Sequence, residues 1–328
     1  QYNISPVDKN SKANIEVVIP EGMSTSNIAK TLYDKGLIRN EFFFKVYLKL
    51  NNAGSLKAST YLLTKSMSLD EIANILVKGN TNEDTIRLTF KEGQTISDYA
   101  KLIENNTNIA SEEFINTTKD ATLLTNLINE YWFLTDDILN ADIYYPLEGY
   151  LFPDTYEFNK DNLTSEKIIR TLLDEEEKKL APYKEELENN NIHSIITLAS
   201  IAELEGVKSE DRKNIISVFY NRLEQGMNLG SDVTTYYAFN EDMDSDLTSE
   251  MFNTYNPYNT RSSEMAGRLP VGPICNPSID SIEAALHPSN SNYLYFVADK
   301  DRNVYFTSSA SEHEEKVHEL KENGDWIW

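Results

Sequence analysis

The sequence predicts an α+β fold, in which a small module precedes a larger domain of mixed helices and strands. Two observations support this class. Residues 17–103 repeat a pattern of strand, turn and helix, and residues 191–206 are apolar around almost the whole helical wheel. A helix of the second kind is buried, so we expect it at the centre of the larger domain. The chain of 328 residues is long enough for two domains and a sizeable core.

The repeat defines the small module. VVIPEGMSTSNIAKTL at residues 17–32 aligns with LTFKEGQTISDYAKLI at residues 88–103. Each copy predicts an alternating strand, a Glu-Gly turn, a Ser/Thr cap and an amphipathic helix. A partial third copy covers residues 61–79, in which Ser68 and Glu71 have the spacing of a capping box.

The expected domains follow from this pattern. Residues 1–14 are polar and predict a flexible tether, residues 15–85 form the small module, and residues 86–328 form the larger domain. A second helix at residues 40–51 gives the module the order strand, helix, helix, strand. In the first half of the larger domain we expect helices over residues 104–143, an irregular aromatic segment at 144–158 and an acidic helix at 165–189. The buried helix is followed by a helix at 209–227, which Ser209 is expected to cap, and by an ordered irregular loop at 255–277. The last expected elements are a short helix at 278–288, a hairpin around 300–303 and a polar helix at 311–323.

Composition excludes several classes of function. The net charge of −23 argues against nucleic acid as a partner, because phosphates require lysine and arginine, and against direct binding to an anionic membrane surface. No run of residues approaches the length of a membrane-spanning helix. The single cysteine, Cys275, excludes an internal disulfide, and four scattered histidines with one cysteine give no zinc pattern. We therefore expect neither a metal nor another cofactor.

Two carboxylates on the buried helix are the candidates for catalysis. Glu203 and Glu205 lie about 200° apart on the helical wheel, so they point to opposite sides. Buried carboxylates are rare unless they are paired or used, and burial raises the pKa of a carboxyl, as a proton donor at neutral pH requires. The alternative is that each glutamate pairs with an arginine or caps a neighbouring loop. The sequence offers several arginines for such a pair: Arg212, Arg222, Arg261 and Arg268.

The other candidate residues each have a structural alternative. We expect Asp232 either to orient the substrate or the glutamate, or to cap a helix that begins near Val233. We expect Asn259 either to bind an N-acetyl group or to close an Asx-turn, and the second is the commoner use of asparagine. Its neighbour Tyr258 is a further candidate for substrate binding. Arg222 lies on an amphipathic helix, where a structural ion pair is the more common role than a ligand contact.

Two residues with reactive side chains are expected to be inert. Cys275 lies among prolines with no basic partner nearby in the sequence, which favours a buried thiol over a nucleophile. His287 precedes Pro288, and no nucleophile motif accompanies it. A role for His287 in a loop or in the core is therefore expected.

Several motifs resemble, in their order and spacing, the YceG-like family of MltG-type endolytic murein transglycosylases. They are PLEGYLFPDTYEF, LASIAELEG, RKNIISVFYNRLEQGMNLGSD, YNTR, LPVGPICNPSIDSIEAALHP and YLYFVAD. The N-terminal module resembles the LysM-like subdomain of the family. The resemblance covers nearly the whole chain from about residue 15, so it implies a LysM-like module followed by a YceG-like catalytic domain.

The resemblance also implies the chemistry. The catalytic glutamate of the family matches Glu205, and Glu203 becomes a supporting residue. The implied reaction cleaves the bond between N-acetylmuramic acid and N-acetylglucosamine and forms 1,6-anhydro-muramic ends. The sequence departs from the usual family pattern at four positions: Leu204 replaces a common Lys, Gly230 a Gln, Arg261 a Tyr, and Val271 a Pro.

The same resemblance implies a place in the cell. The implied partners are peptidoglycan glycan strands, peptidoglycan synthases and proteins of the divisome or elongasome. The chain opens without a methionine or an apolar signal core. The resemblance implies a single-pass membrane anchor upstream, with this region on the extracytoplasmic side. Two alternatives are a non-catalytic peptidoglycan-binding or scaffold protein and a glycan hydrolase that uses Glu205 with Asp232.

Overall fold

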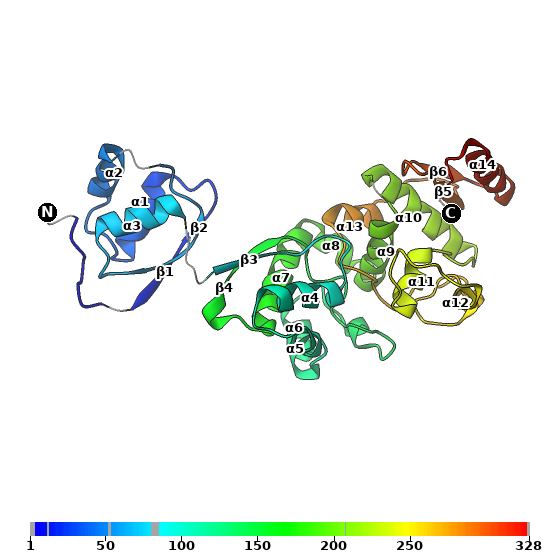
Figure 1. The fold of residues 1–328 in the computed structure, drawn as a ribbon, viewed down its shortest axis with the longest axis horizontal. Coiled ribbons are helices and arrows are strands. Elements are labelled where there is room, and N and C mark those ends of the chain that lie inside the picture. The colour runs from blue at the N-terminus through cyan, green and yellow to red at the C-terminus, as the bar shows by residue number, and fades with distance from the viewer. Residues whose placement is uncertain (1–3, 12, 52–53, 80–84, 207, 327–328) are drawn as a thin grey trace. The chain divides into compact units, whose positions relative to one another are not determined.

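The computed structural model describes residues 4–11, 13–51, 54–79, 85–206 and 208–326. This part of the chain consists of helices and short two-stranded sheets, in agreement with the predicted mixture of the two (Figure 1). The chain divides into two compact units, Gln1–Thr85 and Ile86–Trp328, each with its own hydrophobic core.

The first unit has the element order that the repeat predicted. Its elements are β1 (Asn14–Ile19), α1 (Thr25–Asp34), α2 (Glu41–Leu50), β2 (Ser59–Thr64) and α3 (Leu69–Lys78). The two strands are antiparallel, with Asn14 opposite Thr64. The predicted capping box of Ser68 and Glu71 is present at the start of α3. The apolar faces of all five elements meet in one core, which is why the alternating and amphipathic patterns are regular here.

The segment predicted as a flexible tether is partly bound to the first unit. The main-chain N–H of Leu69, at the start of α3, donates to the carbonyl of Ile4 at 3.1 Å. The guanidinium of Arg39 donates to the carbonyl of Pro6 at 2.7 Å. A helix start has main-chain donors without partners in the helix, and here an upstream carbonyl accepts from one of them.

The second unit contains the remaining elements. Its strands are β3 (Thr85–Thr89), β4 (Thr155–Asn159), β5 (Tyr295–Ala298) and β6 (Val304–Thr307). Its helices are α4 (Ile96–Asn106), α5 (Ser111–Thr118), α6 (Ala121–Glu130), α7 (Ser165–Leu180), α8 (Lys184–Glu188), α9 (Ile192–Glu205), α10 (Ser209–Glu224), α11 (Asp232–Phe239), α12 (Ser249–Asn253), α13 (Ile279–Leu286) and α14 (Ala310–Asn323). The predicted hairpin is present as the antiparallel pair β5–β6.

Three predicted elements differ from the structure. The end of the aromatic segment expected to be irregular forms β4, which pairs with β3. The single helix expected over residues 165–189 is interrupted by a short 3₁₀ turn at Ala181–Tyr183, because Pro182 cannot continue an α-helix. Ser209 is the first residue of α10 and not its cap, since the N-cap is Lys208 and no side chain caps this helix.

Helix α9 lies in the middle of the second unit, as its apolar sequence predicted. It packs against α13, α10, α11 and α8 (Figure 1). Its residues from Ile192 to Ala202 are buried except Ser194, and the helix becomes accessible only in its last turn. The two candidate carboxylates, Glu203 and Glu205, therefore lie at the end of a buried helix. Among the helices of the described ranges, none combines the length and the hydrophobicity needed to cross a membrane.

The loop at residues 255–277 is ordered and mostly buried, and Asn276 holds it against two distant segments. The side-chain carbonyl of Asn276 accepts from the main-chain N–H of Gly149 at 3.0 Å and of Leu151 at 3.1 Å. Its amide donates to the carbonyl of Gln94 at 3.1 Å and to the carboxylate of Glu148 at 3.3 Å. One buried asparagine thus joins the start of α4, the aromatic segment and the loop.

Candidate active site

Glu205 is the last residue of α9 and is partly buried. The hydroxyl of Ser231 donates to its Oε1 at 2.6 Å, and within the described ranges no group donates to Oε2. Burial raises the pKa of Glu205 to about 7, and the negative charge of Asp232 acts in the same direction. The Ser231 hydrogen bond and the charges of Arg261 and Arg222 oppose this rise. The result is a carboxyl that changes its protonation state near neutral pH.

Glu203 is engaged by the protein on both oxygens. Its Oε1 pairs with Arg212 at 3.0 Å. Its Oε2 accepts from the main-chain N–H of Ser278 at 3.0 Å and from the hydroxyls of Ser278 and Ser281 at 2.5 and 2.6 Å. The side chain is only 6% exposed. Glu203 therefore pairs with an arginine, which was the structural alternative to catalysis, and it joins α9 to α10 and to the first turn of α13.

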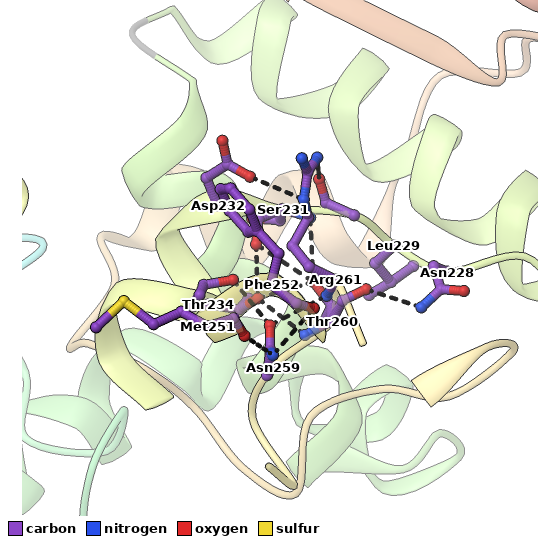
Figure 2. A network of polar contacts seen from close by, with 12 residues as sticks. Asn228, Leu229, Ser231, Asp232, Thr234, Met251, Phe252, Asn259, Thr260 and Arg261 are labelled. Carbon is purple, nitrogen blue, oxygen red and sulfur yellow. Dashed lines mark hydrogen bonds and ion pairs between the residues drawn. The ribbon is translucent and has the colours of Figure 1, made fainter. Parts of the chain in front are cut away.

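Asp232 lies at the surface beside the candidate acid. Its Oδ1 pairs with Nε of Arg261 at 3.2 Å, and the two side chains are 52% and 39% exposed (Figure 2). The Arg261 guanidinium lies 4.6 Å from the ring centroid of Phe252 and donates to the Gly230 carbonyl. Asp232 is the first residue of α11 and not its cap. The N-cap is Ser231, whose hydroxyl is directed to Glu205 instead.

A buried network of hydroxyl groups fixes the position of Ser231 (Figure 2). The main-chain N–H of Ser231 donates to Oγ1 of Thr260 at 3.1 Å, and its carbonyl accepts from Thr234 at 2.6 Å. The two threonine hydroxyls also bond to each other at 2.7 Å. Because all of these groups are buried, the serine that holds Glu205 has little freedom to move.

Asn259 is used within the protein. Its side-chain carbonyl accepts from the hydroxyl of Thr235 at 2.8 Å and from the main-chain N–H of Arg261, two residues on. Its amide donates to the carbonyls of Met251 and Thr254 at 2.8 and 2.7 Å. The side chain is fully buried and closes an Asx-turn, which was the structural alternative to binding an N-acetyl group.

Arg222 and Tyr258 are also part of the framework. Arg222 donates to the carbonyls of Leu294 and Leu229, both at 2.6 Å, and its guanidinium lies 5.1 Å from the ring centroid of Tyr295. These contacts replace the ion pair that the sequence led us to expect, and burial lowers the pKa of Arg222. Tyr258 is fully buried in a group of tyrosine rings, and its hydroxyl accepts from a main-chain N–H.

Gly230 occupies a position where its lack of a side chain matters. Its φ is +65°, and a Cβ there would lie 2.9 Å from Nη1 of Arg222. Its carbonyl accepts from the guanidinium of Arg261 at 3.3 Å. A side chain at this position would therefore be strained by the backbone conformation and would have to displace the end of the Arg222 side chain.

Sequence reasoning passed over two residues near the site. Ser231 carries no signal except its place before Asp232. Glu148 stands alone in the aromatic segment and is 1% exposed. It accepts from the main-chain N–H of Ile96 at 2.9 Å and from the hydroxyl of Tyr237 at 3.1 Å, and burial raises its pKa to about 8. The signal in the sequence that could have identified Glu148 is its place as the only charged residue among the apolar and aromatic residues around it.

The side chains of Cys275 and His287, which the sequence predicted to be inert, make no contact with Glu205 among the described residues. Cys275 is fully buried, its thiol donates to the carbonyl of Ser200 at 3.2 Å, and burial raises its pKa. His287 is at the end of α13, 53% exposed, with Glu186 at 3.4 Å. It is therefore a surface loop residue and not part of the core. Within the described ranges no three potential ligands are clustered to hold a metal ion.

The fold places a partly buried carboxyl of raised pKa, Glu205, at the end of a buried helix, and comparison with known proteins gives the family of the chain. Residues 17–319 match the model of the YceG-like family. The endolytic murein transglycosylase of Bacillus subtilis is 37% identical over 94% of this chain and 86% of its own length. The enzyme of that name from Streptococcus pneumoniae strain D39 is 34% identical over 97% of this chain, which spans 60% of that relative.

A solved structure supports the same assignment. The crystal structure of a YceG-like protein from Listeria monocytogenes is 37% identical and covers 93% of this chain and all of its own, with a TM-score of 0.66. The chain belongs to the YceG-like family.

Proposed function

We propose that the protein is an endolytic lytic transglycosylase of peptidoglycan. It cleaves the bond between N-acetylmuramic acid and N-acetylglucosamine inside glycan strands and leaves 1,6-anhydro-muramic ends. The observation that carries this proposal is Glu205, whose pKa of about 7 lets one carboxyl act first as an acid and then as a base. The names of the relatives from Bacillus subtilis and Streptococcus pneumoniae support the same activity.

The proposed reaction uses the two protonation states of Glu205 in turn. The protonated carboxyl gives its proton to the glycosidic oxygen, and the bond to the muramic acid C1 breaks. The C6 hydroxyl of the same sugar attacks C1, and the ionised Glu205 takes the proton of that hydroxyl. Glu205 returns to its starting state, and no water is consumed.

The surroundings of the other carboxylates support a mechanism with one acid–base group. A hydrolase needs a second carboxylate to activate water or to attack the sugar. Glu203 has both oxygens bound by protein donors. Asp232 is paired with Arg261, so the hydrolase alternative depends on a carboxylate whose charge is already partnered.

For the first unit we propose a LysM-like role in holding glycan. Its strand, helix, helix, strand order supports this reading. A groove of about 450 Å³ lies between the turn after β1, at residues 19–23, and the segment before β2, at residues 55–58. Glu21, Ser55 and Lys57 contribute polar side chains to its lining, which suits the hydroxyl and amide groups of a sugar polymer.

We also propose an extracytoplasmic location, with an anchor in the cytoplasmic membrane. The proposed substrate supports this location, because peptidoglycan lies outside that membrane. Synthases that make glycan strands, with the divisome and elongasome proteins around them, are the protein partners that such an activity calls for.

The test of the proposed function compares Glu205→Gln with Glu203→Gln on isolated peptidoglycan. Glutamine keeps the shape of Glu205 but has no transferable proton, so release of anhydro-muropeptides should fall by ~10²–10⁴-fold in a folded protein. Glu203→Gln should retain more activity and lose stability, by ~1–3 kcal/mol, because it weakens the bonds to Arg212 and α13.

Mass spectrometry of the digest separates the alternatives. Anhydro ends support the transglycosylase, reducing ends would identify a hydrolase, and the absence of products from the wild type would identify a binding protein. Near-normal release by a folded Glu205→Gln variant would refute the assignment of the acid.

A further inference from the structure

Arg261 is held beside the candidate acid by the two sequence neighbours of Ser231. The hydroxyl of Ser231 donates to Glu205 at 2.6 Å. The carbonyl of Gly230 accepts from Nη1 of Arg261 at 3.3 Å, and the carboxylate of Asp232 pairs with Nε at 3.2 Å (Figure 2). One segment of three residues therefore fixes the positions of both the acid and the arginine. The positive charge of Arg261 also acts on Glu205.

The guanidinium of Arg261 is fixed on one side and accessible on the other. Its Nε and Nη1 face acceptors of the protein, and its carbon lies 4.6 Å from the ring centroid of Phe252. Within the described ranges no group accepts a hydrogen bond from Nη2, and the side chain is partly exposed. Because three contacts already orient the fork of donors, a ligand that binds to Nη2 costs little side-chain entropy.

The chemistry of this group selects an anion as the ligand. A guanidinium makes its strongest hydrogen bonds with carboxylates and phosphates, because both partners carry a full charge. Asp232 pairs through the Nε side and leaves the Nη2 side to a ligand. The other arginine that acts on Glu205 is Arg222, and its printed hydrogen bonds all go to main-chain carbonyls of the framework. Arg261 is therefore the cation near the acid whose contacts leave a donor open to a substrate.

We propose that Arg261 binds a carboxylate on the peptide branch of the muramic acid and thereby determines which strands are cleaved. The inference rests on the proposed function, in which the C1 bond of that same sugar is broken at Glu205. A branch whose carboxylates are free is anionic, whereas a branch whose carboxylates are amidated is not. Arg261 thus makes the protein prefer strands with unamidated branches.

The test compares two forms of the same soluble glycan strands, one with free branch carboxylates and one in which a carbodiimide and ammonium chloride have converted them to carboxamides. For the wild type, kcat/KM for release of anhydro ends should be about threefold to fivefold higher with the free carboxylates, the size expected of a partly exposed ion pair. Arg261→Gln should reduce this ratio to about one. Both forms have the same glycosidic bond, so an effect of the substitution on Glu205 itself cancels in the ratio.

A matched control removes an equal charge from the same loop. Arg268 is exposed and lies seven residues further on, so Arg268→Gln should keep the preference of the wild type. Equal rates for both forms in the wild type would overturn the inference and leave Arg261 as a structural partner of Asp232. A preference that survives in Arg261→Gln, or one that is lost equally in Arg268→Gln, would also overturn it. The absence of anhydro ends from both forms would instead overturn the proposed function, and the inference with it.

Discussion

Glu205 and Glu203 are two residues apart on one helix, yet their surroundings give them different chemistry. Glu203 accepts from Arg212 and from the first turn of α13. Glu205 accepts from Ser231 alone among the described residues, and burial raises its pKa to about 7. A desolvated carboxyl with few donors keeps its proton to higher pH than a carboxyl in water does.

The neighbours of Glu205 should move the pH dependence of the reaction in opposite directions. If protonated Glu205 is the acid, kcat/KM should be level at low pH and fall above about pH 7 as the group ionises. Ser231→Ala removes a bond to the anion, so the pKa rises and the fall shifts to higher pH. Asp232→Asn removes a negative charge and frees Arg261 to act on Glu205, so the fall shifts to lower pH.

The measurement is the pH profile of anhydro-end release by the wild type and both variants. An inflection that stays in place in both, or moves the same way in both, would contradict the assignment of Glu205 as the titrating acid. Thermal melts at each pH exclude unfolding as the cause of a shift.

At the residue scale the sequence identified the pair of glutamates and their opposite orientation. Its structural alternative, that each glutamate pairs with an arginine or caps a loop, holds for Glu203, which pairs with Arg212. The sequence did not reveal Ser231, which bonds to Glu205 from 26 residues away, or the bond between Glu148 and Asn276 across 128 residues. Contacts of that separation leave no periodic pattern. Arg222 shows the same limit, since its actual partners are main-chain carbonyls and these have no signature in the side-chain sequence.

At the scale of the elements, patterns with a clear period predicted the structure well. The buried helix, the capping box of α3 and the C-terminal hairpin are where the sequence placed them. Strand β4 was missed because it is short and follows a segment dominated by proline, glycine and aromatic residues. Its pairing with β3 depends on a segment 66 residues upstream, as the contact of Thr155 with Thr89 shows.

One glycine in the aromatic segment should be much more sensitive than another in a similar conformation. Gly149 has φ +89°, and a Cβ there would lie 2.5 Å from Pro273 and 2.9 Å from Ile196. Gly226 has φ +66° with no atom within 4 Å of the Cβ position. Gly226→Ala should cost ~1–2 kcal/mol through the backbone alone. Gly149→Ala should cost a further ~1–3 kcal/mol through overpacking.

Urea unfolding of the two variants gives the comparison directly. Equal losses of unfolding free energy would show that the packing of the aromatic segment against α9 tolerates a methyl group. The larger loss at Gly149 is the expected result, and it should be accompanied by reduced activity because the Gly149 N–H bonds to Asn276.

For the whole molecule, buried glutamates should make stability depend on pH. Burial raises the pKa of Glu148 to about 8 and of Glu205 to about 7, and it raises the pKa of Glu176 as well. In the unfolded chain these groups ionise near pH 4.5, so the stability they contribute is complete below that pH. It is lost as the pH rises toward 8, because the folded protein holds protons that the unfolded chain releases.

The melting temperature should therefore be higher at pH 5.5 than at pH 8.5. Glu148→Gln removes the carboxyl whose pKa burial raises to about 8 and keeps a group that can hydrogen-bond, so the melting temperature of this variant should change less over this range. Asp244→Asn removes an exposed charge instead and should keep the slope of the wild type. If both variants keep that slope, ionisation of Glu148 is not its source.

The contacts of Asn276 also fix when the site can be completed during synthesis. This residue bonds to Gly149 and to Gln94, which precede it by 127 and 182 residues. Helix α9 leaves the ribosome first, and the asparagine that locks the aromatic segment and the serines that hold Glu203 follow more than 70 residues later. Because long-range contacts close late, we expect a nascent chain to contain its acid well before it can use it. A protein proposed to cut the cell wall would thus stay inactive until nearly all of its second unit has folded.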